Sequence, residues 1–523
     1  MVNIRFCVYS FLFLSSISEV AFAGKPTRTA MDSIRPQDVR RHINFLASDS
    51  LRGRNTPGQY LDTAAAYIAE AFKSYGLEPL DGSYFQQFHL DQIHLGTDNF
   101  FTLRDSDHSD TSFQIKRDFM PFEFTAHREI AGALVFAGYG ITAPELNYDD
   151  YAGLDVTGKV VVVLKHEPGE KDPNSVFEGE NISVHGINRT KVENAIAHGA
   201  AGIIIMTDPL NHRSLRPRGF PWPSLYKNIP NSAIAYTLAL LKKKKIPAIQ
   251  AGKALMKKLF VSIDSLKALQ KRIDATLSPH SFEWQGKSAA IQTSIKVVSH
   301  ATQNVAALRQ GRDPDLKKEV IIIGAHYDHV GIKLGEIKDG EDYIYNGADD
   351  NASGTGGLLE IAEAFSKTEP PKRSVIFIAF AGEEKGLFGS RYYTEKPLWP
   401  LTQTKAMLNM DMIGRNQGDK VSIIGYARSP ELNTINTEEN QYVGLKLQYD
   451  GEQFFRRSDH YSFARKNIPV LLYNTGIHQD YHKVTDNPDK INEFKISMIS
   501  KLVFRTAWRA ANSTREFSYI EPN

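Results

Sequence analysis

Five side chains of the types that bind metal ions each follow a run of apolar, often β-branched residues in this chain. They are His326, Asp350, Glu384, Asp411 and His482. In an open α/β sheet, functional groups collect in the crevice beyond the carboxyl ends of the strands. This placement therefore predicts one site rather than five unrelated polar residues.

The five segments that carry these residues repeat one pattern of strand, candidate ligand and helix. They read EVIIIGAHYDH (319–329), NGADDNASGTGG (346–357), SVIFIAFAGEEKGLFG (374–389), AMLNMDMIGR (406–415) and VLLYNTGIHQDYHKVTDNPDKI (470–491). The second segment continues into LLEIAEAF, in which Leu358, Ile361 and Phe365 have helical spacing. The repeat predicts an α/β fold, a mostly parallel mixed sheet covered by helices.

This set of residues is typical of hydrolysis by two zinc ions. Ions roughly 3.5 Å apart need one carboxylate to bridge them and separate histidine and carboxylate ligands at each ion. Five ligands, one of them shared, meet that need. A water held by the ions still requires a base to accept its proton. The adjacent pair Glu383 and Glu384 can divide these tasks, with one carboxylate on a metal and its neighbour taking the proton.

The ordered motifs GAHYD, GADDNASG, AGEEKGLFGS, NMDMIG and YHKVTDNPDKI carry a resemblance to a known family. The chain resembles the co-catalytic zinc aminopeptidases, which include secreted bacterial aminopeptidases and, more distantly, glutamate carboxypeptidase. The similarity is dense from about Gln303 to Ile491. It implies a zinc aminopeptidase fold for this region.

The resemblance also implies a role for each candidate ligand. His326 and Asp411 complete one zinc site, and Glu384 and His482 complete the other. Asp350 bridges the two ions. The expected cofactor is therefore two Zn²⁺ per chain.

Three further catalytic residues follow from the resemblance. Glu383 is the expected general base, and the carboxylate of Asp328 is expected to support the imidazole of His326. Tyr481 occupies a position where some relatives place a phenol that polarises the substrate carbonyl, and its alternative role is packing. The peptide bond between Asp350 and Asn351 is expected to be cis.

Ser458, Asp459 and His460 contain the residue types of a serine triad. Consecutive residues of an extended segment point in alternating directions, so they do not form a triad readily. We expect a structural or pocket-lining role for them.

The chain is expected to divide into four parts: a signal peptide (1–23), an N-terminal part of the peptidase domain (24–129), a β-rich insert (130–284) and the catalytic domain (285–523). The insert resembles the protease-associated domain of many relatives. The apolar stretch from Phe6 to Ile17 and the sequence Ala21-Phe22-Ala23 are typical of a cleaved signal, too short to stay in a membrane. Its removal takes away Cys7, so the mature chain has no disulfide, which suits a bacterial periplasm or exterior.

Charge gives no case for a nucleic-acid partner, because 62 Lys and Arg residues nearly balance 60 Asp and Glu residues. The expected partners are peptide substrates, and the oligomeric state is open. We expect an exported two-zinc exopeptidase that removes the N-terminal residue of peptides. The alternatives are a carboxypeptidase or dipeptidase on the same scaffold, for which Arg415, Arg456 and Arg457 could bind a free carboxylate, or a non-catalytic binding ectodomain.

Overall fold

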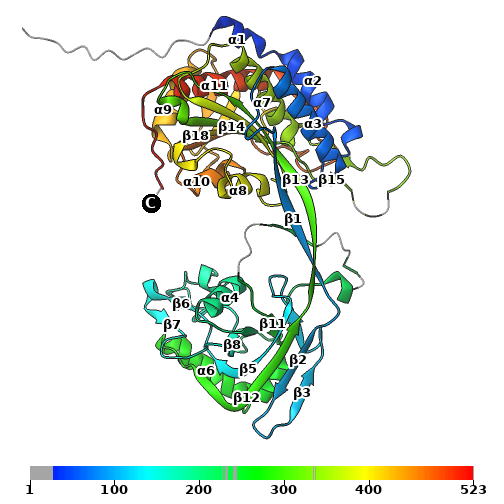
Figure 1. Ribbon diagram of the computed structural model, residues 1–523, viewed down its shortest axis with the longest axis vertical. Coiled ribbons are helices and arrows are strands. Elements are labelled where there is room, and N and C mark those ends of the chain that lie inside the picture. The colour runs from blue at the N-terminus through cyan, green and yellow to red at the C-terminus, as the bar shows by residue number, and fades with distance from the viewer. Residues whose placement is uncertain are drawn as a thin grey trace, which may run out of the picture. The chain divides into compact units, whose positions relative to one another are not determined.

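The computed structural model describes residues 27–226, 228–229, 234–239, 244–333, 335 and 337–521. The chain forms two compact units, one made of its two ends up to Phe88 and from Thr302, and one running from His89 to Ala301 (Figure 1). The predicted signal peptide, residues 1–23, lies outside the described ranges. Within those ranges, every helix is too short or too polar to cross a membrane.

The larger sheet has nine strands, ordered β10-β1-β13-β17-β14-β18-β21-β19-β20. Strands β17, β14, β18 and β21 are parallel neighbours, whereas β13 and β19 flank them in antiparallel orientation. The bounds in that order are β10 (Tyr236–Leu238), β1 (Phe85–Leu95), β13 (Ile295–Arg309), β17 (Ser374–Phe380), β14 (Val320–His326), β18 (Thr404–Met410), β21 (Val470–Asn474), β19 (Lys420–Ile424) and β20 (Lys446–Gln448).

Helices cover both faces of the parallel part of this sheet (Figure 1). One layer contains α1 (Arg28–Ser33), α2 (Pro36–Leu46), α3 (Gln59–Ser74), α7 (Gly354–Ser366), α9 (Pro430–Asn440) and α11 (Glu493–Asn512), and the other contains α8 (Phe388–Glu395) and α10 (His460–Ala464). All residues of β14 and β17 are buried. Strands covered on both faces read as continuous apolar runs, which explains why VIII and VIFIAF are so apolar. The predicted fold class, a helix-covered, mostly parallel mixed sheet, is confirmed.

The chain order of the parallel strands creates a crevice at one edge of the sheet. Strand β14 comes first, and the later strands β17 and β18 pair with its two sides. The connection from β14 to β17 and the connection from β17 to β18 therefore run in opposite directions across the sheet, and such a reversal opens a crevice beyond the carboxyl ends of the strands. His326 is the last residue of β14, so this crevice is where the site must form.

The second unit contains an eight-stranded sheet, ordered β3-β2-β12-β5-β8-β9-β11-β4. Its bounds are β3 (Asp110–Phe113), β2 (Phe100–Arg104), β12 (Phe282–Thr293), β5 (Arg128–Phe136), β8 (Val160–Leu164), β9 (Gly202–Met206), β11 (Ala248–Ala251) and β4 (Phe119–Pro121). Strands β5, β8, β9 and β11 are parallel neighbours. They pack with α4 (Asn188–Ala197), α5 (Lys253–Leu259) and α6 (Ile263–Thr276). Each unit also contains one two-stranded ribbon. In the second unit, β6 (Thr142–Ala143) pairs with β7 (Tyr148–Asp149). In the first unit, β15 (Gly331–Ile332) pairs with β16 (Ile344–Tyr345).

This unit is longer than the insert of residues 130–284 that the sequence predicts, and runs from His89 to Ala301. The extra residues belong to it because β12 pairs antiparallel with both β2 and β5. Strands β2 to β4, predicted as part of the peptidase domain, therefore complete the sheet of the second unit.

Candidate metal centre

The crevice at the carboxyl edge of the larger sheet brings all five predicted ligands together. His326 ends β14, Asp411 directly follows β18, and Glu384 follows β17. Asp350 lies in the turn before α7, and His482 lies in the loop after β21. Their ligand atoms gather in two groups that share one residue, Asp350.

The two oxygens of the Asp350 carboxylate face different groups. Its Oδ1 lies 3.3 Å from His326 Nε2, which lies 3.4 Å from Asp411 Oδ1. Its Oδ2 lies 3.0 Å from His482 Nε2, and that nitrogen lies 3.0 Å from Glu384 Oε2. Ligands about 2.0–2.1 Å from a tetrahedral zinc are about 3.3 Å from one another. The spacing in both groups fits that geometry.

Three of these ligand atoms are buried and make no hydrogen bond with the residues that the structure describes: His326 Nε2, His482 Nε2 and Glu384 Oε1. A buried polar atom without a partner costs free energy, and native structures contain few of them. His326 Nε2 belongs to one ligand group, and His482 Nε2 and Glu384 Oε1 belong to the other. Imidazole nitrogens and carboxylate oxygens are donors that zinc prefers. The residues therefore fit a bound pair of zinc ions.

Glu383 lies beside this cluster and lines the adjacent cavity. Its Oε2 lies 4.0 Å from His326 Nε2, and its side chain is only 11% exposed. Burial, together with the charges of Asp411 and Glu384, raises the pKa of the Glu383 carboxyl well above its usual range. A carboxylate that readily holds a proton is suited to general-base work.

Asp328 is predicted to support the His326 ring with its carboxylate. Asp328 Oδ1 lies 3.7 Å from His326 Nδ1, which is within ion-pair distance but longer than a hydrogen bond. The carbonyl oxygen of Asp328 lies 3.2 Å from that nitrogen instead. The carboxylate accepts the backbone N–H of Glu383 at 3.1 Å. Asp328 thus links the predicted ligand to the backbone of the predicted base.

Tyr481 lines the cavity and stacks on the ring of His482, with centroids 4.0 Å apart. Burial and the nearby carboxylates Asp350 and Glu384 raise the pKa of its phenol, so the hydroxyl keeps its proton. Its oxygen lies 3.5 Å from an Arg457 nitrogen. The phenol is available as a hydrogen-bond donor at the cavity wall.

The peptide bond between Asp350 and Asn351 is cis, as the resemblance implies. The Asn351 side chain donates to the carbonyl of Met410 at 3.0 Å and accepts the N–H of Met412 at 3.2 Å. These bonds hold both neighbours of Asp411. Asn351, which follows the shared ligand Asp350, therefore also positions the predicted ligand Asp411.

The segment 458–460 does not form a serine triad. Ser458 Oγ accepts from the Asn409 side chain at 2.8 Å and lines the cavity. The side-chain oxygens of Asp459 and the ring nitrogens of His460 are buried and make no hydrogen bond in the part of the chain that the structure describes. Burial raises the pKa of Asp459 to about 7 and lowers that of His460 to about 3.

Arg54 is a residue of the site that the sequence reasoning missed. Its guanidinium is buried and donates to the backbone carbonyls of Tyr327, Leu46, Asn346, Gly347 and Asp350. Burial lowers its pKa to about 10, whereas the nearby carboxylates, Asp350 foremost, raise it. The side chain stays cationic at neutral pH. It ties the loop after β14 to the loop that carries the shared carboxylate.

His329 is a second residue that the sequence reasoning missed. It is fully buried, and its Nδ1 lies 2.8 Å from Glu384 Oε1 and 3.9 Å from Asp350 Oδ2. Apart from these ion-pair contacts, neither ring nitrogen makes a hydrogen bond of good geometry with the described residues. His329 joins Asp350, Glu384 and His482 in the second ligand group. The available signal was the motif HYDH, in which this histidine follows His326 by three residues.

A pocket open to solvent, about 470 Å³ with that solvent included, is lined by the predicted ligands Asp350 and Asp411. Its lining combines metal-ligand side chains and the predicted base with apolar side chains. The lining residues are Asp350, Glu383, Asp411, Met412, Phe454, Arg457, Ser458, Leu472, Asn474, Ile477 and Tyr481. The cavity therefore places an apolar pocket next to the cluster of metal-ligand side chains.

Comparisons with known proteins point to a family of peptidases. Residues 304–507 match the model of peptidase family M28. A probable zinc metalloprotease of Pyricularia oryzae (strain 70-15) is 27% identical over 279 residues, which cover 44% of this chain and 53% of the relative. Aminopeptidase YwaD of Bacillus subtilis (strain 168) is 25% identical over 248 residues, which cover 44% of this chain and 50% of the relative. The chain spans about half the length of these curated relatives.

Among solved structures, an aminopeptidase from Aneurinibacillus sp. strain AM-1 aligns with 94% of this chain and 98% of its own, at 21% identity and a TM-score of 0.47.

Replacing His329 tests its part in the second ligand group. We expect His329→Gln to weaken the binding of one zinc ion by about 10- to 100-fold, because a side chain that contacts a ligand carboxylate tunes metal affinity by that amount. Zinc titration against a competing chelator measures this. His42→Gln is the matched control, since His42 is a buried histidine 3.3 Å from the carboxylate of Glu360, outside both groups. Equal zinc affinity in both variants contradicts the assignment.

Proposed function

We propose that this chain, whose residues 304–507 belong to peptidase family M28, is a two-zinc aminopeptidase. It would hydrolyse the peptide bond after the N-terminal residue of a peptide. The observation that carries the proposal is the position of the Asp350 carboxylate between the two ligand groups. One oxygen lies 3.3 Å from His326 Nε2, and the other lies 3.0 Å from His482 Nε2. A bridging carboxylate of this kind is what a two-metal hydrolase requires.

The proposed ligands are His326, Asp350 and Asp411 for one ion, and Asp350, Glu384 and His482 for the other, with His329 beside the second group. Bound zinc supplies Lewis acidity, which lowers the pKa of water and polarises the scissile carbonyl.

Glu383 is proposed to move the proton. Its carboxylate accepts the proton that water loses on attacking the carbonyl carbon, and then delivers that proton to the nitrogen of the leaving amine. The Tyr481 phenol donates a hydrogen bond to the carbonyl oxygen as negative charge develops there. Both side chains line the cavity, so both can reach a bound peptide.

The charges and walls of the cavity support a substrate with a free N-terminus and an apolar first side chain. The carboxylates of Asp350, Glu383 and Asp411 in the lining favour an amine. The apolar lining residues, Met412, Phe454, Leu472 and Ile477, can bury an apolar side chain. The names of two relatives, a probable leucine aminopeptidase of Trichophyton verrucosum and aminopeptidase YwaD, agree with this choice.

A carboxypeptidase remains the second candidate because of Arg457, which lines the cavity and could bind a free carboxylate. Arg415, which the sequence analysis also named as a possible carboxylate-binding residue, forms ion pairs within the protein. It donates to Asp480 at 2.7 Å and lies 3.8 Å from Asp486.

Export is part of the proposal, supported by the signal-like stretch Phe6 to Ile17 and the site Ala21-Phe22-Ala23. N-terminal sequencing of chain recovered outside the cytoplasm should then begin at Gly24.

Replacing the proposed base should separate proton transfer from metal binding. We expect Glu383→Gln to lower kcat by at least ~10² to 10⁴, the usual loss for a general base, while zinc content stays unchanged. Glu384→Gln is the matched control, and it should lose zinc from the second group. Steady-state kinetics and elemental analysis report both quantities. A Glu383 variant without zinc would reassign this residue as a ligand.

Blocked peptides test the direction of attack. A peptide with N-terminal leucine should be cleaved, and N-acetylation should abolish its cleavage because a neutral amide cannot replace the amine beside the carboxylates. Amidation of its C-terminus should leave the rate nearly unchanged. Mass spectrometry of the products identifies the residue released. Cleavage of the acetylated but not the amidated peptide would transfer the assignment to a carboxypeptidase.

A further inference from the structure

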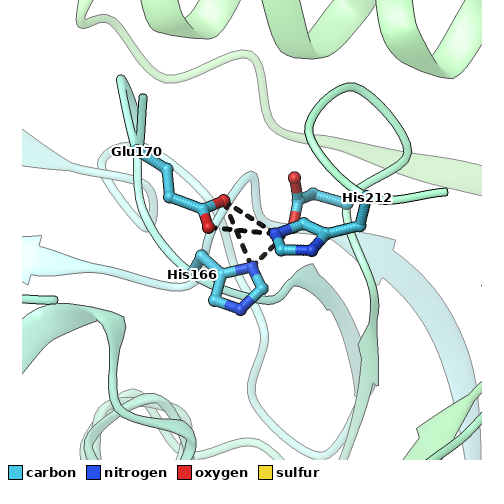
Figure 2. A group of neighbouring side chains, drawn as sticks. His166, Glu170 and His212 are labelled. Carbon is cyan, nitrogen blue, oxygen red and sulfur yellow. Dashed lines mark hydrogen bonds and ion pairs between the residues drawn. The ribbon is translucent and has the colours of Figure 1, made fainter. Parts of the chain in front are cut away.

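A second cluster of metal-ligand side chains lies in the unit His89–Ala301, away from the residues that match the peptidase family. Its members are His166, Glu170, Asp208 and His212. Figure 2 shows the carboxylate of Glu170 and the rings of His166 and His212 converging on one point. Four potential donors, two nitrogens and two oxygens, thus meet within the second unit.

Two neighbouring strands deliver these side chains. His166 and Glu170 follow β8, and Asp208 and His212 follow β9. The two strands are parallel and pair up to Leu164 and Met206, their last residues. Their carboxyl ends therefore lie side by side, and the loops that continue from them meet at the same edge of the sheet.

Three of the four separations between the donor atoms are close to those around a tetrahedral ion, and the fourth is a hydrogen bond between His166 and Asp208. His166 Nδ1 lies 2.7 Å from Asp208 Oδ1 and 3.4 Å from Glu170 Oε2. His212 Nε2 lies 3.0 Å from Glu170 Oε2 and 3.5 Å from Asp208 Oδ1. Zinc with bonds of about 2.0–2.1 Å separates its ligands by about 3.3 Å. The corresponding separations around Asp350 run from 3.0 Å to 3.4 Å, within the range of 2.7 Å to 3.5 Å found here.

The charges of the cluster also match a divalent cation. Asp208 is fully buried and Glu170 is 8% exposed, so their two negative charges have little access to water. Buried charges need a partner of opposite sign. Among the described residues, one lysine forms an ion pair with these carboxylates. It is Lys171, whose exposed ammonium lies 3.7 Å from Glu170. Two neutral imidazoles, two carboxylates and one divalent ion form a neutral, closed site.

Surrounding side chains hold the ligands in place. Gln270 of α6 donates to Asp208 Oδ2 at 3.1 Å, which leaves Oδ1 facing the cluster. The buried Lys191 ammonium of α4 donates to the carbonyl oxygen of His166. His166 itself has a left-handed backbone, with φ of 62°, as does the proposed zinc ligand His482 at 53°. Contacts of this kind orient ligands before a metal arrives.

We propose that His166, Glu170, Asp208 and His212 bind one divalent transition ion of the zinc class as a structural site. Four protein ligands leave no open position for substrate, which is typical of structural rather than catalytic zinc. The ion would clip the loop after β8 to the loop after β9. The second unit has no cysteine, so the bound ion would cross-link the two loops as a disulfide does in other proteins. The proposal does not depend on the peptidase activity.

The test counts zinc in the purified full chain by elemental analysis, starting from a variant in which the peptidase cluster is disabled. Asp350→Ala removes the carboxylate shared by both catalytic groups. After exchange against a mild chelator, we expect the Asp350→Ala chain to keep one zinc ion more than the double variant. The double variant carries Asp350→Ala and Asp208→Asn. His212→Gln should lose the same ion. Asparagine keeps the size of aspartate and its contact with Gln270, so circular dichroism should report a folded chain.

His185→Gln is the matched control, since His185 lies in the same unit and is 2.8 Å from a single carboxylate, that of Glu145. It should keep the zinc. Cobalt exchanged into the Asp350→Ala chain adds a second measurement, because a tetrahedral site gives a visible absorption band that Asp208→Asn should remove. Equal zinc content and equal spectra with and without Asp208→Asn, or no zinc in the Asp350→Ala chain, would overturn the proposal. Neither result bears on the peptidase assignment, which the blocked peptides test.

Discussion

The burial of many carboxylates at one edge of a sheet is the constraint on which this structure depends. Asp328, Asp350 and Asp459 are at most 3% exposed, and Glu383 and Glu384 adjoin them. Buried charges of one sign repel strongly in a medium of low dielectric constant, so they require cations. The protein supplies one in Arg54, and the two candidate ligand groups that share Asp350 are where the proposed zinc ions would supply the others.

Buried strands position the candidate site residues, and these residues lie at the strand ends and in the loops that follow. The parallel strands β14, β17 and β18 are buried and end in the crevice, so the positions of His326, Glu383 and Asp411 follow from the sheet. Helix α7 reinforces this edge, because Thr355 donates to the carbonyl of His326 at 2.7 Å. His482 comes from a loop, and its left-handed backbone turns its ring toward the shared carboxylate of Asp350.

The second unit uses the same principle on a smaller scale. Its parallel strands β8 and β9 carry the residues of the proposed clip just beyond their carboxyl ends, as β14 and β18 carry His326 and Asp411. The difference lies in the ligand sets. The cluster around Asp350 has a pocket beside it, whereas the second cluster, of which Asp208 is a member, brings four ligand side chains together. An open position supports catalysis, and a closed one supports structure.

The sequence by itself determined the fold class and the residues that converge on the crevice, because both depend on local patterns. Apolar runs of strand length mark buried parallel strands, and a histidine or carboxylate at the end of such a run marks the edge at which the strands meet. Only the tertiary structure decided the rest. Arg54, His329 and the true extent of the second unit depend on contacts between distant residues, such as Arg54 with Asn346 and the pairing of β12 with β2. The cluster around Asp208 depends on the register of β8 against β9. Periodicity carries no information about such pairings, since each one is selected by packing in the whole fold.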